Sequence, residues 1–226
     1  MKFILIKSIY VILILFLNNS YAKSFDAEYV VSASGIKIGE FVWSLKITER
    51  NYTTEISLKN SGIFSPIYKF QGRYESRGVL ENNMFMAKEY KQYWETKKKT
   101  KIVKMTFNEY VTNLFQKPEE KEFARVDLNE LYEYFDPLTS FLNILFGNNN
   151  VKTIDGRRIY IMMKDSDNKS DTVTIKIKDY KNIWADHKRN DLEYIEIFQE
   201  KTSGSFVMPH QIKIKFDGVV FVLTKN

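Results

Sequence analysis

Residues 136–147, with the sequence DPLTSFLNILFG, break the strand-like pattern of the rest of the chain and decide how it folds. Asp136 is a favourable N-cap, and Pro137 suits the first position of a helix. The apolar residues that follow recur at intervals of three and four positions, and Gly147 ends the run. A helix that is apolar on nearly every side belongs in a protein interior, so the sequence predicts a buried helix over 138–146.

Around this helix, apolar and polar residues alternate in the manner of half-buried strands. The clearest runs are 41–47, 102–107, 173–178 and 206–216. Together with the turn signals between them, they predict roughly ten to twelve strands. No crossover of helix length separates most neighbours, which favours antiparallel pairing. The predicted fold is mainly β, with a single long, curved antiparallel sheet that wraps one apolar helix.

Turn residues mark where these strands reverse. Asp217-Gly218 is the strongest hairpin signal, and Asp155-Gly156 is the second. Asn82-Asn83 and Asn148 to Asn150 are weaker turn signals. Asp127 and the apolar residues after it indicate a short additional helix.

The first 22 residues have the pattern of a secretory signal peptide. Lys2 and Lys7 precede an apolar run over 9–17, and Ser20-Tyr21-Ala22 fits the small-x-small rule for cleavage after Ala22. The alternative is a membrane anchor, although the run is shorter than the roughly 20 residues that span a bilayer. We therefore expect a signal peptide over 1–22 and one soluble periplasmic domain over 23–226, which does not span the membrane after cleavage.

Composition excludes several classes of protein. The absence of cysteine rules out disulfides and a lipoprotein cleavage site. The net charge is +6, and its densest basic run, 97–101, lies between two predicted strands. We interpret this run as a solvated hairpin tip, and we expect no nucleic-acid partner. Lysines fill the polar phase of the strands, which argues against an outer-membrane barrel with a lipid-facing surface.

Several stretches together resemble the exported bacterial family of unknown function numbered 3108. They are Ser34 to Gly39, the strand pair 74–107 with Gly78, Asp136 to Leu142, Asp155-Gly156-Arg157-Arg158, and Pro209 before a final hairpin. The Asp-Pro-Leu helix followed by the Asp-Gly-Arg hairpin is the more specific part. The resemblance implies a periplasmic, β-rich protein, and it carries over no catalytic residues because none are established for that family.

No chemical motif stands out. His187 and His210 are the two histidines, too few for a zinc site without cysteine, and we predict that His210 is a half-buried core residue. Asp186 precedes His187, but adjacent side chains on an extended backbone point apart. The acidic run 165–171 lacks the glycine of a calcium loop, so we read it as an ordinary loop. We predict no catalytic residues, no metal and no cofactor.

The aromatic and apolar side chains are the remaining signal. They predict either a site for an apolar ligand, such as an acyl chain or other lipid, between sheet and helix, or plain core packing. The candidate ligand-binding residues are Trp43, Tyr90, Trp94, Leu138, Phe141, Leu142 and Leu145. A non-catalytic ligand-binding protein is therefore one hypothesis. The others are an interaction or scaffold module with a packed core that docks an envelope protein, and a hydrolase that uses two carboxylates.

Overall fold

The computed structural model describes residues 22–62, 69–108, 111–165, 171–184, 191–200 and 206–226. Nearly all of the predicted signal peptide, all of the Asp186-His187 pair and most of the acidic run 165–171 lie outside these ranges. Within them, no helix is long and apolar enough to cross a membrane.

The described residues form one antiparallel sheet in which every strand pairs with its neighbours. The spatial order is β7-β6-β5-β4-β3-β2-β1-β13-β12-β11-β10-β9-β8, so two consecutive meanders meet where β1 pairs with β13. The first meander consists of β1 (Lys23–Ala33), β2 (Ile36–Ile47), β3 (Asn51–Asn60), β4 (Phe70–Glu81), β5 (Met84–Thr96), β6 (Thr100–Phe107) and β7 (Val111–Lys117). The second consists of β8 (Asn150–Ile154), β9 (Arg158–Lys164), β10 (Thr172–Asn182), β11 (Leu192–Phe198), β12 (Gln211–Phe216) and β13 (Val219–Lys225).

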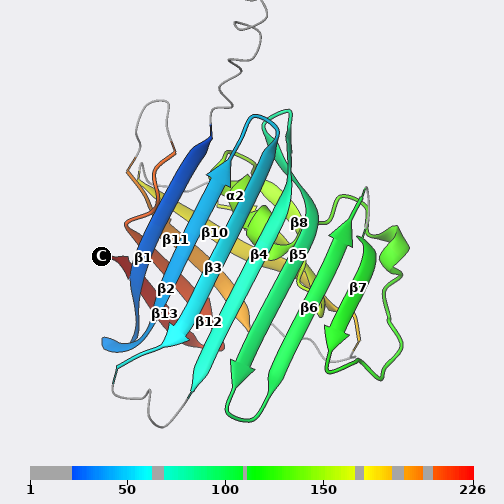
Figure 1. Ribbon diagram of the computed structural model, residues 1–226, viewed down its shortest axis with the longest axis horizontal. Helices are drawn as coiled ribbons and strands as arrows, with labels where there is room; N and C mark the ends of the chain where they lie inside the picture. The colour runs from blue at the N-terminus through cyan, green and yellow to red at the C-terminus, as the bar shows by residue number, and fades with distance from the viewer. Residues whose placement is uncertain (1–21, 63–68, 109–110, 166–170, 185–190, 201–205) are drawn as a thin grey trace, which may run out of the picture.

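The sheet is folded over on itself, as a twisted sheet of this many strands must be. Figure 1 shows strands β1 to β7 as a front layer, with the strands of the second meander crossing behind it and α2 (Pro137–Leu145) in between. The helix contacts β4 and β5 of the front layer and β8 and β9 of the back layer. The predicted mainly β fold, one curved antiparallel sheet around one apolar helix, is confirmed.

The turn chemistry sets the register of the hairpins. Asp217 and Gly218 join β12 to β13 with φ angles of 51° and 74°, the left-handed pair that a two-residue hairpin requires. Asn82 and Asn83 do the same between β4 and β5, with φ angles of 50° and 63°. The described residues form thirteen strands, where the sequence predicted roughly ten to twelve. The five-residue β8 begins at Asn150, inside an asparagine run that the sequence indicated as a turn.

The predicted inward phase of the strands forms the core. Trp43 and Leu45 of β2, Met105 of β6 and Ile175 of β10 are buried, as the alternation predicted. His210 corrects one prediction, because its side chain is exposed at the start of β12 and its ring centroid lies 6.3 Å from that of Phe198. The basic run forms the tip of the β5–β6 hairpin, as predicted.

The helix begins where the sequence indicated. Asp136 is its N-cap, and its carboxylate accepts hydrogen bonds from the backbone N–H groups of Leu138 and Thr139. Leu142 and Ile144 are buried, as predicted, and so are polar residues of the helix. Upstream, Asp127 caps a single 3-10 turn, η1 (Leu128–Glu130), in place of the short helix expected there.

Candidate functional site

A half-open cavity of about 780 Å³ lies between the two layers of the sheet. Its size falls within the range of small-molecule pockets, roughly 300–1,000 Å³. Strands β2 to β6 form one wall, and the β8–β9 turn with β9 and the end of β10 forms much of the other. Pro137 and Leu138, at the N-terminal end of α2, also contribute to the lining. The cavity is therefore placed by long-range folding of the sheet and lies beside the first turn of the helix.

The wall contributed by the front layer is mostly apolar and aromatic. Most of its members come from alternate positions of successive strands, as expected of residues on one face of a sheet, whereas the two from β6 are adjacent. Apart from Lys101 of β6, they are Phe41 of β2, Ile56 and Leu58 of β3, Tyr74 of β4, Tyr90, Gln92 and Trp94 of β5, and Ile102 and Val103 of β6. Burial raises the pKa of Tyr74 to about 12, so its phenol is neutral at physiological pH.

The opposite wall is polar and is built around Arg158. The Asp155 carboxylate accepts hydrogen bonds from Arg158 Nε at 2.9 Å and from the backbone N–H groups of Arg157 and Arg158. Asp155 and Asp191 both form ion pairs with the Arg158 guanidinium. Tyr160 and Asn182 continue this wall. The Asp-Gly-Arg hairpin thus folds around a local ion-pair cluster that faces the cavity.

The β8–β9 turn also ties the two layers together. The carbonyl oxygen of Gly156 accepts hydrogen bonds from Gln116 Nε2 of β7 at 2.5 Å and from Trp184 Nε1 at 3.1 Å. Gly156 has a φ of +85°, and a Cβ there would lie 2.6 Å from Val103 Cγ1. A side chain at this position would therefore be strained and crowded. A second hollow of about 640 Å³ shares Gln116 and Trp184 with the cavity.

Away from the cavity, a buried hydrogen-bond network fixes α2 to the sheet. Asp136 Oδ2 accepts from Ser76 Oγ at 2.9 Å and from Thr139 Oγ1 at 2.5 Å. The Tyr52 hydroxyl lies 2.6 Å from Thr139 Oγ1 and 3.4 Å from Ser76 Oγ. Burial raises the pKa of Asp136, while these hydrogen bonds oppose the shift. The Asp-Pro-Leu motif therefore caps the helix and fixes it to the sheet.

Further along the helix, Asn143 and Ser140 extend this network. Asn143 Nδ2 donates to the carbonyl oxygen of Phe85 at 2.9 Å, and its Oδ1 accepts from the Phe85 N–H at 2.8 Å. Thr153 Oγ1 of β8 donates to Ser140 Oγ at 2.8 Å. The polar residues of α2 thus bond to both layers of the sheet.

The seven residues predicted as ligand contacts fall into two groups. Tyr90, Trp94 and Leu138 line the cavity. The other four pack elsewhere in the interior, and the Trp43 ring lies 5.5 Å from that of Phe141. The four residues outside the cavity lining are Trp43, Phe141, Leu142 and Leu145.

Sequence reasoning did not single out several polar residues of the cavity. Arg157 and Tyr74 lie in stretches that were quoted only for the family resemblance, and Tyr160 and Asn182 belong to strands for which no motif was quoted. The Asp-Gly-Arg-Arg hairpin was the available signal, because two arginines directly after a tight turn place charge at a strand end. Among the described residues, no group of three or more His, Cys, Asp or Glu side chains is arranged to hold a metal ion.

Comparison with known proteins gives a family and a distant likeness in structure. No curated protein matches the chain. A crystal structure of a β-barrel-like protein of the domain of unknown function DUF1849, from Brucella abortus, is similar with a TM-score of 0.48 and 9% sequence identity. That likeness covers 89% of this chain and 94% of the other. The family described as "Protein of unknown function (DUF3108)" matches residues 25–194, and the chain belongs to this family.

Proposed function

We propose that this protein is an exported, non-catalytic protein of the bacterial periplasm that binds an apolar ligand, such as an acyl chain. The observation that carries the proposal is the cavity of about 780 Å³ with an aromatic and aliphatic wall. Protein interiors are packed as densely as organic crystals, and voids larger than a water molecule are few. A hollow of this size lined by apolar side chains is suited to an apolar occupant.

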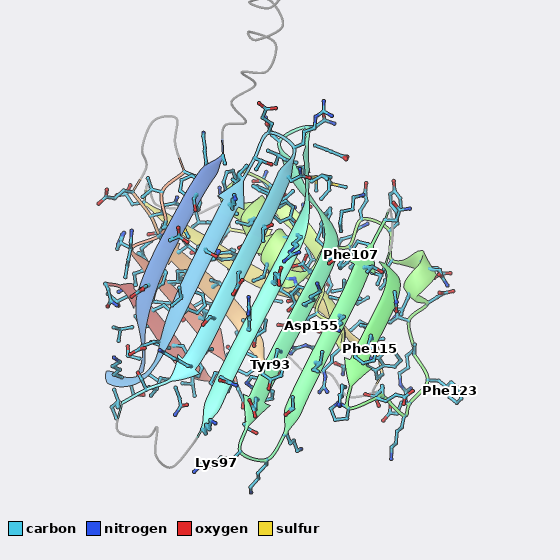
Figure 2. All side chains as sticks on the ribbon, viewed as in Figure 1. Tyr93, Lys97, Phe107, Phe115, Phe123 and Asp155 are labelled. Atoms are coloured by element: carbon cyan, nitrogen blue, oxygen red, sulfur yellow. The ribbon has the colours of Figure 1, made fainter. Side chains whose placement is uncertain are left out.

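The cavity favours the ligand-binding hypothesis, because a scaffold module with a fully packed core would have no such hollow. An envelope-protein partner is nevertheless the second candidate, because β7 is an edge strand. Edge strands offer unpaired backbone groups to a partner. Figure 2 labels two aromatic side chains at this edge, Phe115 on β7 and Phe123 beyond it, and both are exposed.

A two-carboxylate hydrolase receives less support. Four carboxylates line the cavity: Asp155 and Asp191 are both bound to the Arg158 guanidinium. Glu120 accepts two backbone N–H groups of its own loop, and Glu122 lies 4.0 Å from the Arg125 guanidinium. A glycosidase-type mechanism needs one carboxyl group to donate a proton and the other to act as nucleophile or base. Two carboxylates that are held by one arginine are placed to fix a turn.

Binding is tested with N-phenyl-1-naphthylamine, a neutral apolar dye that fluoresces in apolar surroundings. We expect the wild-type protein to bind it with saturation. Leu58→Trp, on the cavity wall, should abolish binding because the larger ring fills the hollow. Val42→Trp is the matched control, because Val42 is 38% exposed and lies next to Phe41, whose side chain faces the cavity.

Two results would contradict the proposal. One is a wild-type protein that does not increase the dye's fluorescence. The other is a Leu58→Trp variant that folds normally and binds the dye as the wild type does.

Export is tested separately by the mass of protein recovered from the periplasm, which should correspond to a chain that begins at Lys23. Recovery in membranes with residues 1–22 intact would favour the anchor.

A further inference from the structure

The two walls of the cavity differ in chemistry, and the difference bears on the ligand. The front-layer wall is dominated by apolar and aromatic side chains, while the wall that includes the β8–β9 turn carries arginines, carboxylates and an asparagine. A purely apolar ligand would leave this second wall without partners. The cavity as a whole is electrically balanced, because its lining contains four basic and four acidic side chains. Any preference for a charged ligand must therefore come from which groups are free.

Arg158 is not free. Its guanidinium is bound by Asp155 and by Asp191, and Asp155 also accepts two backbone N–H groups. The charged groups of this cluster are therefore paired with one another. Arg158 therefore holds the turn in place, and it has little capacity left for a ligand.

Arg157, the residue before it, is in the opposite situation. Its backbone N–H donates to Asp155 Oδ1 at 2.9 Å, and its carbonyl oxygen accepts from the Ile183 N–H at 2.8 Å. The backbone is thus fixed on both sides, and the half-buried side chain lines the cavity. Within the described part of the chain, the guanidinium forms no ion pair or hydrogen bond.

Two further donors on this wall have no acceptor among the described residues. Asn182, which pairs in register with Arg158, has a buried Nδ2 with no hydrogen-bond partner. The Tyr160 hydroxyl makes no hydrogen bond to any described residue, and burial raises its pKa well above the ordinary value, so it keeps its proton. A guanidinium, an amide and a phenol share one wall and offer hydrogen bonds that the protein does not accept. Of the three, Asn182 Nδ2 is fully buried, and leaving it unsatisfied is costly, so this wall indicates an acceptor-rich group of a ligand.

We infer that the ligand is an anionic amphiphile, whose carboxylate or phosphate head group is held by Arg157 and Asn182 while its chain lies along the apolar wall. Arginine binds both kinds of head group through paired N–H donors, which explains why a guanidinium is placed there. This inference rests on the proposed function, because it assumes that the cavity accepts an apolar chain. It adds the charge and the position of the head group.

The test uses four probes with the same dodecyl chain, each below its micellar concentration, in competition with the dye. The probes are dodecanoate, dodecyl phosphate, dodecanol and dodecyltrimethylammonium. We expect both anions to bind about tenfold more tightly than dodecanol, as a charged hydrogen bond predicts, and the cation to bind least. A preference between the two anions identifies the head group and supports the inference.

Arg157→Gln separates the head group from the chain. It should lower the affinity for the two anions about tenfold and leave dodecanol unchanged. The unfolding midpoint should change little, because the guanidinium forms no ion pair or hydrogen bond with a described residue. Arg73→Gln is the control, because Arg73 is mostly exposed and paired with Glu55, and it should alter neither affinity.

The outcomes distinguish the two proposals. If all four probes bind equally and Arg157→Gln changes nothing, the head-group inference is wrong and the apolar-ligand proposal stands. If the cation binds best, the inference is also wrong. If neither the dye nor any of the four probes binds, the apolar-ligand proposal fails as well.

Discussion

The interior of this protein contains two regions that treat buried polar groups in opposite ways. Around α2, Asp136, Thr139 and Ser76 are completely buried, and each has hydrogen-bond partners within the protein. Around the cavity, Tyr160 and Asn182 present polar groups that no described residue satisfies. We call the satisfied group around Asp136 the closed network, and the group around Tyr160 and Asn182 the open network.

This contrast separates residues that hold the fold from residues that are available for a ligand. A satisfied buried network strengthens and specifies a core, whereas an unsatisfied one costs free energy unless something else completes it. The Asp-Pro-Leu motif belongs to the closed network, and the Asp-Gly-Arg hairpin spans both types. Arg158 completes its own cluster, and Arg157 does not.

The largest effect is expected from breaking the closed network at its centre. Asp136→Ala removes the N-cap of α2 and leaves the hydroxyl groups of Ser76 and Thr139 without their shared acceptor. A lost cap costs about 1 kcal/mol and each unsatisfied buried group about 1–3, so we expect a loss of roughly 4 kcal/mol. Urea denaturation followed by circular dichroism measures it.

Asp127→Ala is the matched control, because Asp127 caps the 3-10 turn η1 in an exposed position. Its removal should cost about 1 kcal/mol or less. Equal losses in the two variants would show that the network around Asp136 contributes nothing beyond an ordinary cap.

The second test applies one substitution to both regions. Leu142→Ala, in the packed region, should cost about 3 kcal/mol through lost burial and a new cavity. Leu58→Ala should cost about 1 kcal/mol, because Leu58 already borders an open hollow and is only partly buried. Denaturant unfolding of the ligand-free protein measures both losses of stability. A Leu58→Ala variant that loses as much as Leu142→Ala would mean that the hollow is filled by packing in solution.

Local chemistry explains which features the sequence could predict. The cap at Asp136, the positive φ of Gly218 and the alternation around Leu45 each depend on a few neighbouring residues. The family resemblance rested on the same short stretches, and it was confirmed. Helices, hairpins and the faces of strands were predictable for this reason.

The cavity was not predictable because it depends on which strands face each other across the folded sheet. Trp43 and Trp94 both lie on strands of the front layer and were both candidates. The Trp43 ring packs against Phe141 of α2, whereas Trp94 lines the hollow. Tyr74 and Tyr160 come from strands of different layers, and alternation alone makes each a core residue. Only the fold-over of the sheet distinguishes these positions.

The smallest and most discriminating effect is expected from removing single hydroxyl groups. Tyr52→Phe breaks the 2.6 Å hydrogen bond to Thr139 and should cost about 1 kcal/mol. Tyr74→Phe removes a hydroxyl that bonds to no described residue, so the stability of the ligand-free protein should change by less than about 0.5 kcal/mol.

Burial raises the pKa of Tyr74 to about 12, above the value of about 10 in the unfolded chain. Ionisation therefore lowers stability as the pH rises from about 10 to 12, and Tyr74→Phe should weaken that decline.

Thermal unfolding of both variants at pH 7 and at pH 11 measures both effects. A large loss for Tyr74→Phe at pH 7 would show that its hydroxyl is bound within the protein, so the cavity would not be the open network described above. A negligible loss, combined with weaker binding of the dodecyl anions, would instead extend the set of ligand contacts from the polar wall to the opposite one. Either result decides whether Tyr74 belongs with the residues that hold the fold or with those that are available for a ligand.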